Sequence, residues 1–369
     1  MRITGGEQVR QAVTDAVTVL GTATERDWGA TRAGSLEWSC RETAAHIASD
    51  LIAYAGNLAG RAQDAYVPFQ INVDGSDDGL DPADNAGLLH VIETTGALFT
   101  ATLDTTPRAT RAFHPYPFRS ANREGFAAMG IAEVLLHTHD MAEGLGLPPY
   151  QPPADLCAFV LTRIFPHVRP GPDHWTTLLW ATGRADLPGR PRLTEWRWSN
   201  NLVLPAERLT LEGVTPAVAA DLAAGGDGGF DWLAGGPIDG TREGAGLLLK
   251  QYEAGTHRPE WGMYVLVRPD DDRALGAMGF HGVPDADGRV EIGYDLTEPA
   301  RGHGYATEAL RTLAAWALSR EEVEIVFATV ERENTKSQAV LERAGFTRVS
   351  AADDDGGLYA YELRASRYR

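Results

Sequence analysis

The stretch Arg301-Gly302-His303-Gly304-Tyr305-Ala306 combines residue types that could hold a phosphate group. It lies between an apolar, strand-like run at residues 290–296 and a helix-like run at residues 307–318. Gly302 and Gly304 lack a Cβ, so the backbone there can turn its amides toward a ligand. The N-terminus of the following helix adds unsatisfied N–H groups and a partial positive charge. The sequence therefore predicts an anion-binding loop, and a nucleotide cofactor is the ligand that we expect.

Three motifs around this loop resemble those of the GNAT N-acetyltransferase family. Arg-x-x-Gly-x-Ala at residues 301–306 is similar to the family's acetyl-CoA pyrophosphate loop. Asn334-x-x-Ser337, followed by residues 340–346, resembles its next motif, in which the Asn lies beside the pantetheine arm. Glu291-Ile292-Gly293-Tyr294 resembles the preceding strand in the branch named for the ribosomal-protein acetyltransferases RimJ and RimL. The resemblance implies acetyl-CoA as cofactor and a primary amine as acceptor, on a small molecule or at a protein N-terminus.

The same resemblance implies roles for individual residues. Acyl transfer needs a base for the amine and a proton donor for the leaving thiolate. Glu291 is the candidate base, and Ser337 is the candidate donor because the Tyr that many relatives use is absent from residues 334–346. The alternatives are a solvated strand residue for Glu291 and a helix cap for Ser337. The cofactor-binding residues that we expect are Leu296, Arg301, Gly302, His303, Gly304, Tyr305, Ala306 and Asn334.

The elements needed to position these residues can be read from the C-terminal half. Apolar or alternating runs at residues 208–213, 262–267, 274–280, 290–296, 325–330 and 358–363 predict strands. Thr215-Pro216 predicts a helix start, with Thr as N-cap and Pro at the first helical position. We therefore expect a GNAT mixed α/β domain over residues 205–369. Its acceptor pocket should be built around residues 231–253, where the sequence does not specify the substrate.

The N-terminal part has the pattern of helices. Residues 9–20, 40–58, 86–103 and 124–145 each carry apolar residues at helical spacing, which predicts a four-helix bundle. Ser39 and Glu42 have the spacing of a capping box at the second helix. Residues 60–84, rich in Asp, Gly and Pro, form the expected loop between the second and third helices.

This bundle contains a candidate metal site. Glu133 and His137 are four residues apart and project from one helix face, while His46 lies in the apolar middle of the second helix. Two imidazoles and a carboxylate suit Zn²⁺ or another divalent transition metal. The alternative is a hydrogen-bonded core His46 beside an ordinary helical Glu133–His137 pair. Asp140, three residues after His137, could orient that ligand.

Residues 38–47 and 133–140 resemble the metal-binding motifs of the DinB-like mycothiol-dependent maleylpyruvate isomerase family. The resemblance implies that His46, Glu133 and His137 hold the metal, leaving an open position for water or a thiol. It extends to a small α/β subdomain after the bundle. We expect three segments: a DinB-like bundle at residues 1–147, the subdomain at 148–204 and the GNAT domain at 205–369.

Composition excludes several classes of function. The chain has 369 residues and a net charge of −18, and its field repels nucleic acid and anionic membranes. No apolar run reaches the roughly 18 residues of a membrane helix. Two cysteines and the absence of a secretory-type N-terminus favour a reducing cytoplasm. Nothing in the sequence sets the oligomeric state.

Three functions remain open at this stage. The first is an acetyl-CoA-dependent N-acetyltransferase fused to a divalent-metal-binding DinB-like domain. The second is a metal- and mycothiol-dependent thiol transferase or isomerase, whose product the GNAT domain processes or senses. The third is a non-catalytic binding protein that has kept the folds and lost the reactions. The intact loop at residues 301–306 favours the first over the third, and the complete His46, Glu133 and His137 set keeps the second open.

Overall fold

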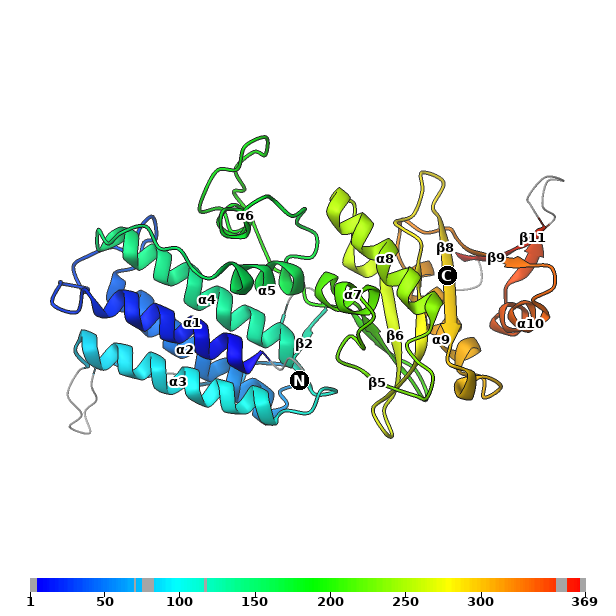
Figure 1. Ribbon diagram of the computed structural model, residues 1–369, viewed down its shortest axis with the longest axis horizontal. Coiled ribbons are helices and arrows are strands. Elements are labelled where there is room, and N and C mark those ends of the chain that lie inside the picture. Colours follow the sequence, from blue (N-terminus) through cyan, green and yellow to red (C-terminus); the bar gives the residue numbers. More distant parts are fainter. Residues whose placement is uncertain (1–4, 70, 75–82, 116–117, 350–356, 366–369) are drawn as a thin grey trace. The chain divides into compact units, whose positions relative to one another are not determined.

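The protein is described from a computed structural model, which covers residues 5–69, 71–74, 83–115, 118–349 and 357–365 (Figure 1). The chain divides into two compact units. The first comprises Met1–Phe165 and Pro170–Asn200, and the second comprises Pro166–Arg169 and Asn201–Arg369. The change of unit at Asn200 lies close to the expected start of the GNAT domain.

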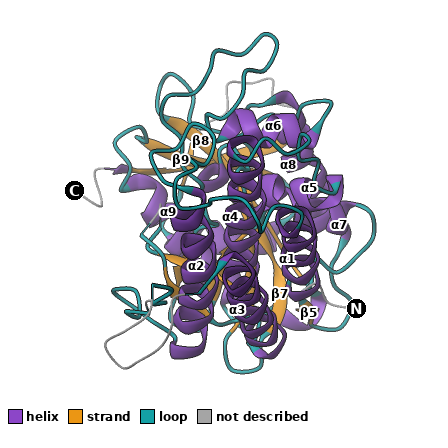
Figure 2. Ribbon diagram, turned by 90° about the vertical axis from the view of Figure 1, so that its left-hand side faces the viewer, coloured by secondary structure: helices purple, strands orange, loops and turns teal. Residues whose placement is uncertain are grey.

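The first unit is built on four long helices that lie side by side, as Figures 1 and 2 both show. They are α1 (Gly6–Gly21), α2 (Cys40–Gly60), α3 (Asn85–Thr105) and α4 (Arg123–Gly144). The predicted capping box at the start of α2 is confirmed, because the side chain of each of Ser39 and Glu42 bonds the other's backbone amide. Helix α4 is buried along most of its length and contacts each of the other three helices. Most of its side chains are therefore enclosed by the protein.

Helix α3 has the length and apolar composition of a membrane-spanning helix, but buried core helices of globular proteins can have both as well. It is long and apolar enough to cross a membrane by length and composition, and 44% of its most apolar window is buried inside the protein. Because α3 packs against both α1 and α2, its apolar face already has protein partners. The apolar composition of α3 is therefore not evidence that it spans a membrane.

A short hairpin and two further helices complete the first unit. Strands β1 (Arg111–Phe113) and β2 (Ser120–Asn122) pair just before α4, and α5 (Ala154–Ile164) and α6 (His174–Ala181) follow it. The expected α/β character of residues 148–204 is wrong. This segment contains two helices and one isolated bridge, and its first strand begins at Val203 and joins the sheet of the second unit. Prolines 148, 149, 152, 153, 188 and 191 lack the N–H that a strand ladder needs.

The second unit is a mixed sheet with helices. Its strands run in the order β10-β11-β9-β8-β7-β6-β4-β3, and β5 pairs with β7 off this path. The strands are β3 (Val203–Pro205), β4 (Thr210–Gly213), β5 (Asp231–Trp232), β6 (Met263–Arg268), β7 (Arg273–Phe280), β8 (Arg289–Leu296), β9 (Ile325–Glu331), β10 (Thr347–Val349) and β11 (Leu358–Arg364). The helices are α7 (Pro216–Ala223), α8 (Asp239–Ala254), α9 (Tyr305–Leu318) and α10 (Thr335–Ala344).

An apolar core joins α7 and α8 to one face of β6 and β7. Leu222 and Leu248 from the helices pack with Val265 and Ala277 from the strands in one buried cluster. Helices α9 and α10 contact β8, β9 and β10 instead. Successive side chains of a strand point to opposite faces, so each strand of the sheet can serve both sets of helices.

Candidate functional site

Strands β8 and β9 form a fork in the middle of the sheet. They pair in parallel only from Arg289↔Ile325 to Glu291↔Phe327, although β8 continues to Leu296. From Tyr361↔Ala328 onward, β9 pairs with β11 alone, whereas β8 continues to pair with β7 on its other edge. Within the described residues, one edge of β8 beyond Glu291 therefore lacks a strand partner. Backbone groups on such an edge can hydrogen-bond an extended ligand.

The glycine loop lies at the open end of the fork. Gly302 (φ 79°) and Gly304 (φ 85°) adopt the left-handed conformation that favours glycine, and Gly304 is the N-cap of α9. A hollow of about 1100 Å³, the loop pocket, is lined by this loop, by β8 residues 294–296 and by α10. All the expected cofactor-binding residues line it except His303. The His303 ring is exposed, and its Nδ1 lies 2.8 Å from the Arg301 carbonyl oxygen.

The loop pocket has the charge that a phosphate-bearing ligand needs. Arg301, Lys336 and Arg343 line it, against the carboxylates of Asp295 and Glu298. Arg343 also lines an adjacent hollow of about 480 Å³, where Arg311 lies beside an ion pair of Arg208 with Glu308. The Arg208 side chain donates to the His303 carbonyl oxygen at 3.1 Å, which ties the loop to residues before β4. Backbone amides at a helix N-terminus together with nearby guanidinium groups favour anion binding.

Two hydroxyl groups meet where β8 faces α10. The Tyr294 hydroxyl lies 2.6 Å from Ser337 Oγ, and either oxygen can be the donor. Ser337 is not the cap of α10, because Asn334 Oδ1 accepts from the Ser337 backbone N–H at 3.1 Å. Burial is the main reason why the pKa of Tyr294 is raised, so its proton stays in place at neutral pH. Both side chains line the loop pocket and could together protonate a leaving group there.

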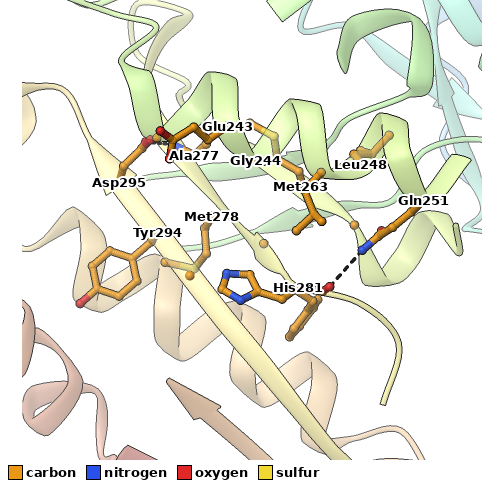
Figure 3. A pocket seen from close by; sticks show the side chains of 16 residues that line it. Glu243, Gly244, Leu248, Gln251, Met263, Ala277, Met278, His281, Tyr294 and Asp295 are labelled. Carbon is orange, nitrogen blue, oxygen red and sulfur yellow. Dashed lines mark hydrogen bonds between the residues drawn. The ribbon is translucent and has the colours of Figure 1, made fainter. Parts of the chain in front are cut away.

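A second hollow of about 280 Å³, the α8 pocket, lies between α8 and strands β6, β7 and β8. Figure 3 shows Asp295 and Glu243 at one end, His281 and Gln251 at the other, and Met263 and Met278 between them. Among the described residues that line this pocket there is no Lys or Arg. Its lining is therefore apolar in the middle and acidic at one end, and suits a cation with an apolar body.

Asp295 belongs to both pockets and is held firmly. Its carboxylate accepts from the Ala277 N–H at 3.0 Å and from Thr241 Oγ1 at 2.9 Å. Burial raises its pKa to about 6, against these hydrogen bonds, which lower it. Tyr294 lines both pockets as well, so the two hollows meet at residues 294 and 295 of β8.

Glu291, the predicted base, is paired with a residue that sequence reasoning did not select. Its Oε2 lies 3.1 Å from His281 Nδ1, and its Oε1 accepts from Thr329 Oγ1 at 2.8 Å across the fork. The hydrogen bond between the two side chains lowers the pKa of Glu291 and raises that of His281. Glu291 is therefore a partnered carboxylate, not the solvated strand residue considered as the alternative.

The first unit brings the three expected metal ligands together. One donor atom from each of His46, Glu133 and His137 lies within 4.8 Å of the others. Glu133 Oε2 is 3.0 Å from His137 Nε2 and 3.5 Å from His46 Nε2. Burial opposes ionisation of Glu133 and His137. Hydrogen bonds to His137 and His46 nevertheless lower the pKa of Glu133 to about 2, and hydrogen bonds to Asp140 and Glu133 raise that of His137 to about 9. The set could hold a cation or persist as an ion-pair cluster.

The far side of His137 is fixed by a buried acid. Asp140 Oδ2 lies 3.1 Å from His137 Nδ1, and Arg184 donates to the same carboxylate at 2.8 to 3.2 Å. The Asp140 side chain is only 2% exposed. This bond directs His137 Nε2 toward Glu133, as an orienting partner of a metal ligand would. Sequence spacing indicated Asp140, whereas Arg184 gave no local signal.

Asp50 is a fourth polar group at the triad. Its Oδ2 is 3.4 Å from His46 Nε2. Burial, with the nearby Glu133 charge, raises the pKa of Asp50 to about 7. Asp50 lies one helical turn after His46, so the i, i+4 spacing that identified Glu133 and His137 could have found it.

The second unit is thus a mixed α/β domain in which a forked sheet, a glycine loop at the start of a helix and a hollow with three cationic side chains form a candidate anion-binding site. Residues 208–347 match the family model described as Acetyltransferase (GNAT) domain. The C-terminal half of the chain thus carries a GNAT acetyltransferase domain.

Individual relatives match part of the chain. The chain is 41% identical to the uncharacterized N-acetyltransferase YjdG of Bacillus subtilis over 22% of this chain and 49% of that protein. It is 32% identical to the uncharacterized N-acetyltransferase p20 of Bacillus licheniformis over 28% of this chain and 55% of the relative. The chain thus spans about half the length of the curated relatives it matches. Among solved structures, the chain is similar to Mycobacterium smegmatis RimJ in complex with CoA-disulfide. The match covers 45% of this chain and 88% of that chain, at 19% sequence identity and a TM-score of 0.33.

Proposed function

We propose that the protein is an acetyl-CoA-dependent N-acetyltransferase acting on a primary amine. The observation that carries this proposal is the meeting of two hollows at Tyr294 and Asp295, one lined by three cationic side chains and the other, among the described lining residues, by none. The basic loop pocket suits the phosphates and pantetheine of acetyl-CoA. The acidic α8 pocket suits an amine that arrives as an ammonium ion. Their junction would place the thioester beside the nitrogen, which is the proximity that acyl transfer requires.

The residues of the chain would divide the work as follows. Backbone amides of Gly302 and Gly304 and the N-terminus of α9 bind phosphate oxygens. The unpaired edge of β8 offers hydrogen bonds to the pantetheine arm and to the thioester carbonyl oxygen. Asp295 attracts the ammonium group, and the Tyr294–Ser337 pair donates a proton to the departing thiolate.

The acceptor that fits is a primary amine without a neighbouring carboxylate. An α-amino acid would place its carboxylate among Asp295 and Glu243, with no Lys or Arg among the described lining residues to compensate. An amine on a small molecule, or the N-terminus of a peptide, avoids that repulsion. We therefore expect methionine amide to be acetylated at least tenfold more efficiently than methionine, as kcat/KM.

Titration of the purified protein with acetyl-CoA by calorimetry tests the proposal before any acceptor is known. We expect one site per chain, eliminated by Gly304→Glu, because the new carboxylate repels phosphate and a side chain at φ 85° strains the loop. Gly229→Glu is the matched control, since Gly229 has φ 76° and open space around it, in another loop. Absence of binding by the unaltered protein at millimolar acetyl-CoA would refute the proposal.

We further propose that the bundle is a DinB-like domain that binds a divalent metal, with Zn²⁺ as the first candidate. His46, Glu133 and His137 would be the ligands, and the three donor atoms within 4.8 Å of one another support this. A bound divalent cation would supply an open position for water or a small thiol. Metal analysis of the purified protein, compared with His46→Ala, tests it. His46→Ala should lose the metal and keep acetyl-CoA binding.

A metal- and mycothiol-dependent activity of the bundle is the second candidate function. It is favoured by the partial exposure of His46, whose side chain is 31% exposed, because a substrate needs access to the metal. Turnover of an electrophile such as maleylpyruvate with mycothiol, lost in Glu133→Gln, would support this reading. A protein that binds acetyl-CoA and metal but turns over neither kind of substrate would be a non-catalytic binding protein.

A further inference from the structure

The side chain of His281 lines the α8 pocket, where the acceptor amine of the proposed acetyl transfer would bind. Residue 281 follows β7 directly, and its backbone N–H donates to the Glu291 carbonyl oxygen at 3.0 Å. The His281 carbonyl oxygen accepts from Gln251 Nε2 of α8 at 3.0 Å (Figure 3). The backbone of His281 is thus held from both sides, by β8 and by α8, although its side chain is 51% exposed.

The two ring nitrogens have different surroundings. Nδ1 lies 3.1 Å from Glu291 Oε2, and Glu291 is held in turn by Thr329. Nε2 lies over the backbone of Gly293, because a Cβ built there would be only 2.8 Å from it. Only glycine at position 293 leaves room for the ring in this place. A carboxylate on Nδ1 fixes the neutral tautomer that carries its proton on Nδ1, which leaves the Nε2 lone pair toward the pocket.

We propose that His281 is the general base of the acceptor site and that Glu291 is its positioning residue. The inference rests on the proposed acetyl transfer and changes the role first expected for Glu291. Glu291 itself is not among the residues that line the α8 pocket, whereas His281 and Gly293 are. The acceptor ammonium would lie along the β8 wall of the pocket, between the His281 ring over Gly293 and the Asp295 carboxylate, and its apolar body would contact Met263 and Met278.

The proton and electron balance of the step is complete. The ammonium group gives one proton to Nε2 of neutral His281 and becomes a neutral amine. Its nitrogen forms the C–N bond with the acetyl carbon while the C–S bond breaks and the electron pair leaves with sulfur. The Tyr294–Ser337 pair protonates the thiolate. The second proton lost by nitrogen restores that pair through water, and His281 releases its proton to solvent.

The charged groups around the ring determine the expected pH dependence. Glu291 on β8 contacts it, and the other titratable side chains that line the pocket are Glu243 on α8 and Asp295 and Tyr294 on β8. The hydrogen bond to Glu291 raises the pKa of His281, with burial opposing it. Because the base must be neutral, kcat should increase with pH as His281 loses its proton. Glu291→Gln should move this increase to lower pH, since the amide lacks the charge that raises the pKa.

The experiment compares His281→Gln, Glu291→Gln and Gly293→Ala, with His90→Gln as control. His90 is likewise an exposed histidine beside a glutamate, since its Nδ1 lies 3.7 Å from Glu93 Oε2, but it lies on α3, in the other unit. The probes are phenethylamine and methionine amide at saturating acetyl-CoA, and calorimetry checks acetyl-CoA binding by each variant. We expect His281→Gln to lower kcat by about 10²-fold or more and to abolish the pH dependence of kcat. Glu291→Gln should lower kcat by about tenfold or less, because an amide oxygen still accepts from Nδ1.

The outcomes separate this inference from the function on which it rests. Gly293→Ala should lower kcat in the same direction as His281→Gln with unchanged melting temperature, because an exposed ring can move aside. A larger loss in Glu291→Gln than in His281→Gln would overturn the inference and make Glu291 the base, while acetyl transfer would stand. An unaltered pH profile of kcat in His281→Gln would likewise overturn the assignment of His281 as the base. Acetyl-CoA binding by the unaltered protein without transfer to either amine would overturn the assigned acceptor site and its base. Absence of acetyl-CoA binding would overturn both.

Discussion

Replacement of Asp140 by Asn tests whether the triad of the bundle is built to hold a metal. Asp140 is 2% exposed, and its carboxylate bonds both His137 Nδ1 and Arg184. Asn keeps the size, but it is neutral and replaces one carboxylate oxygen by an NH₂ donor, which cannot accept from Arg184 or from a His137 Nδ1–H. In Asp140→Asn, His137 loses the carboxylate that orients its Nε2 toward Glu133.

The expected magnitude follows from that loss. Removal of an orienting partner of a metal ligand typically costs about 10- to 100-fold in affinity. We therefore expect the Zn²⁺ dissociation constant of Asp140→Asn to rise by this factor, about 1.4 to 2.7 kcal/mol. The metal-free protein should also lose about 1.5 to 3 kcal/mol of stability, because a buried hydrogen bond to a charged group is lost.

Competition with a chromophoric chelator measures the dissociation constant, and urea unfolding with excess chelator measures the stability. Asp15→Asn is the matched control, since Asp15 accepts a 2.7 Å bond from Tyr150 in the same unit but lies on α1, whereas the triad lies on α2 and α4. Equal Zn²⁺ affinity of Asp140→Asn and the unaltered protein would refute the orienting role. Lack of Zn²⁺ binding by the unaltered protein would leave the triad as an ion-pair cluster of Glu133 with two histidines.

Three further predictions concern the second unit. Tyr294→Phe removes the hydroxyl that lies 2.6 Å from Ser337 Oγ. Steady-state kinetics should show kcat reduced about 10²-fold with little change in the KM for acetyl-CoA. An unchanged kcat would exclude the Tyr294–Ser337 pair as the proton donor. Because the pKa of Asp295 is raised to about 6, the KM for phenethylamine should increase as pH falls through that value, and Asp295→Asn should remove this dependence. His257 is buried with both ring nitrogens lacking a hydrogen-bond partner among the described residues, and burial lowers its pKa to about 4. The unfolded chain binds this proton near pH 6.5 and the folded chain only near pH 4, so stability should fall as pH decreases from 6.5 to 4; urea unfolding should show a smaller decrease in His257→Leu.

Local chemistry explains which parts of the site could be predicted from the sequence. The glycine loop depends on backbone conformation within six residues, and Gly302 and Gly304 have the positive φ that their residue type suggested. Glu133 and His137 share a face because they are one helical turn apart. His46 reaches them only through packing of α2 against α4, which helical spacing cannot supply. The resemblance to a known bundle provided that step.

His281 was missed although a signal for it existed. The segment 285–288, Asp-Ala-Asp-Gly, marks a tight turn between two strand-like runs. Antiparallel pairing of Phe280 with Ile292 puts residue 281 opposite Glu291. Counting outward from the turn could therefore have paired His281 with Glu291. Tyr294 was missed for another reason: alternation gives the face on which it lies, but the approach of α10 that brings Ser337 to it is tertiary.

One strand explains how both halves of the proposed reaction meet. Glu291, Gly293 and Asp295 alternate with Ile292 and Tyr294 along β8, so the first set lies on the face toward α8 and the second on the face toward α10. The base, the room for its ring and the ammonium anchor thus lie on one face of β8, and the proton donor for the thiolate lies on the other. A thioester bound along the unpaired edge of β8 would lie between them. An insertion of one residue within β8 after Glu291 would exchange the two faces, and we expect it to abolish transfer to amines even if the loop at residues 301–306 still binds acetyl-CoA.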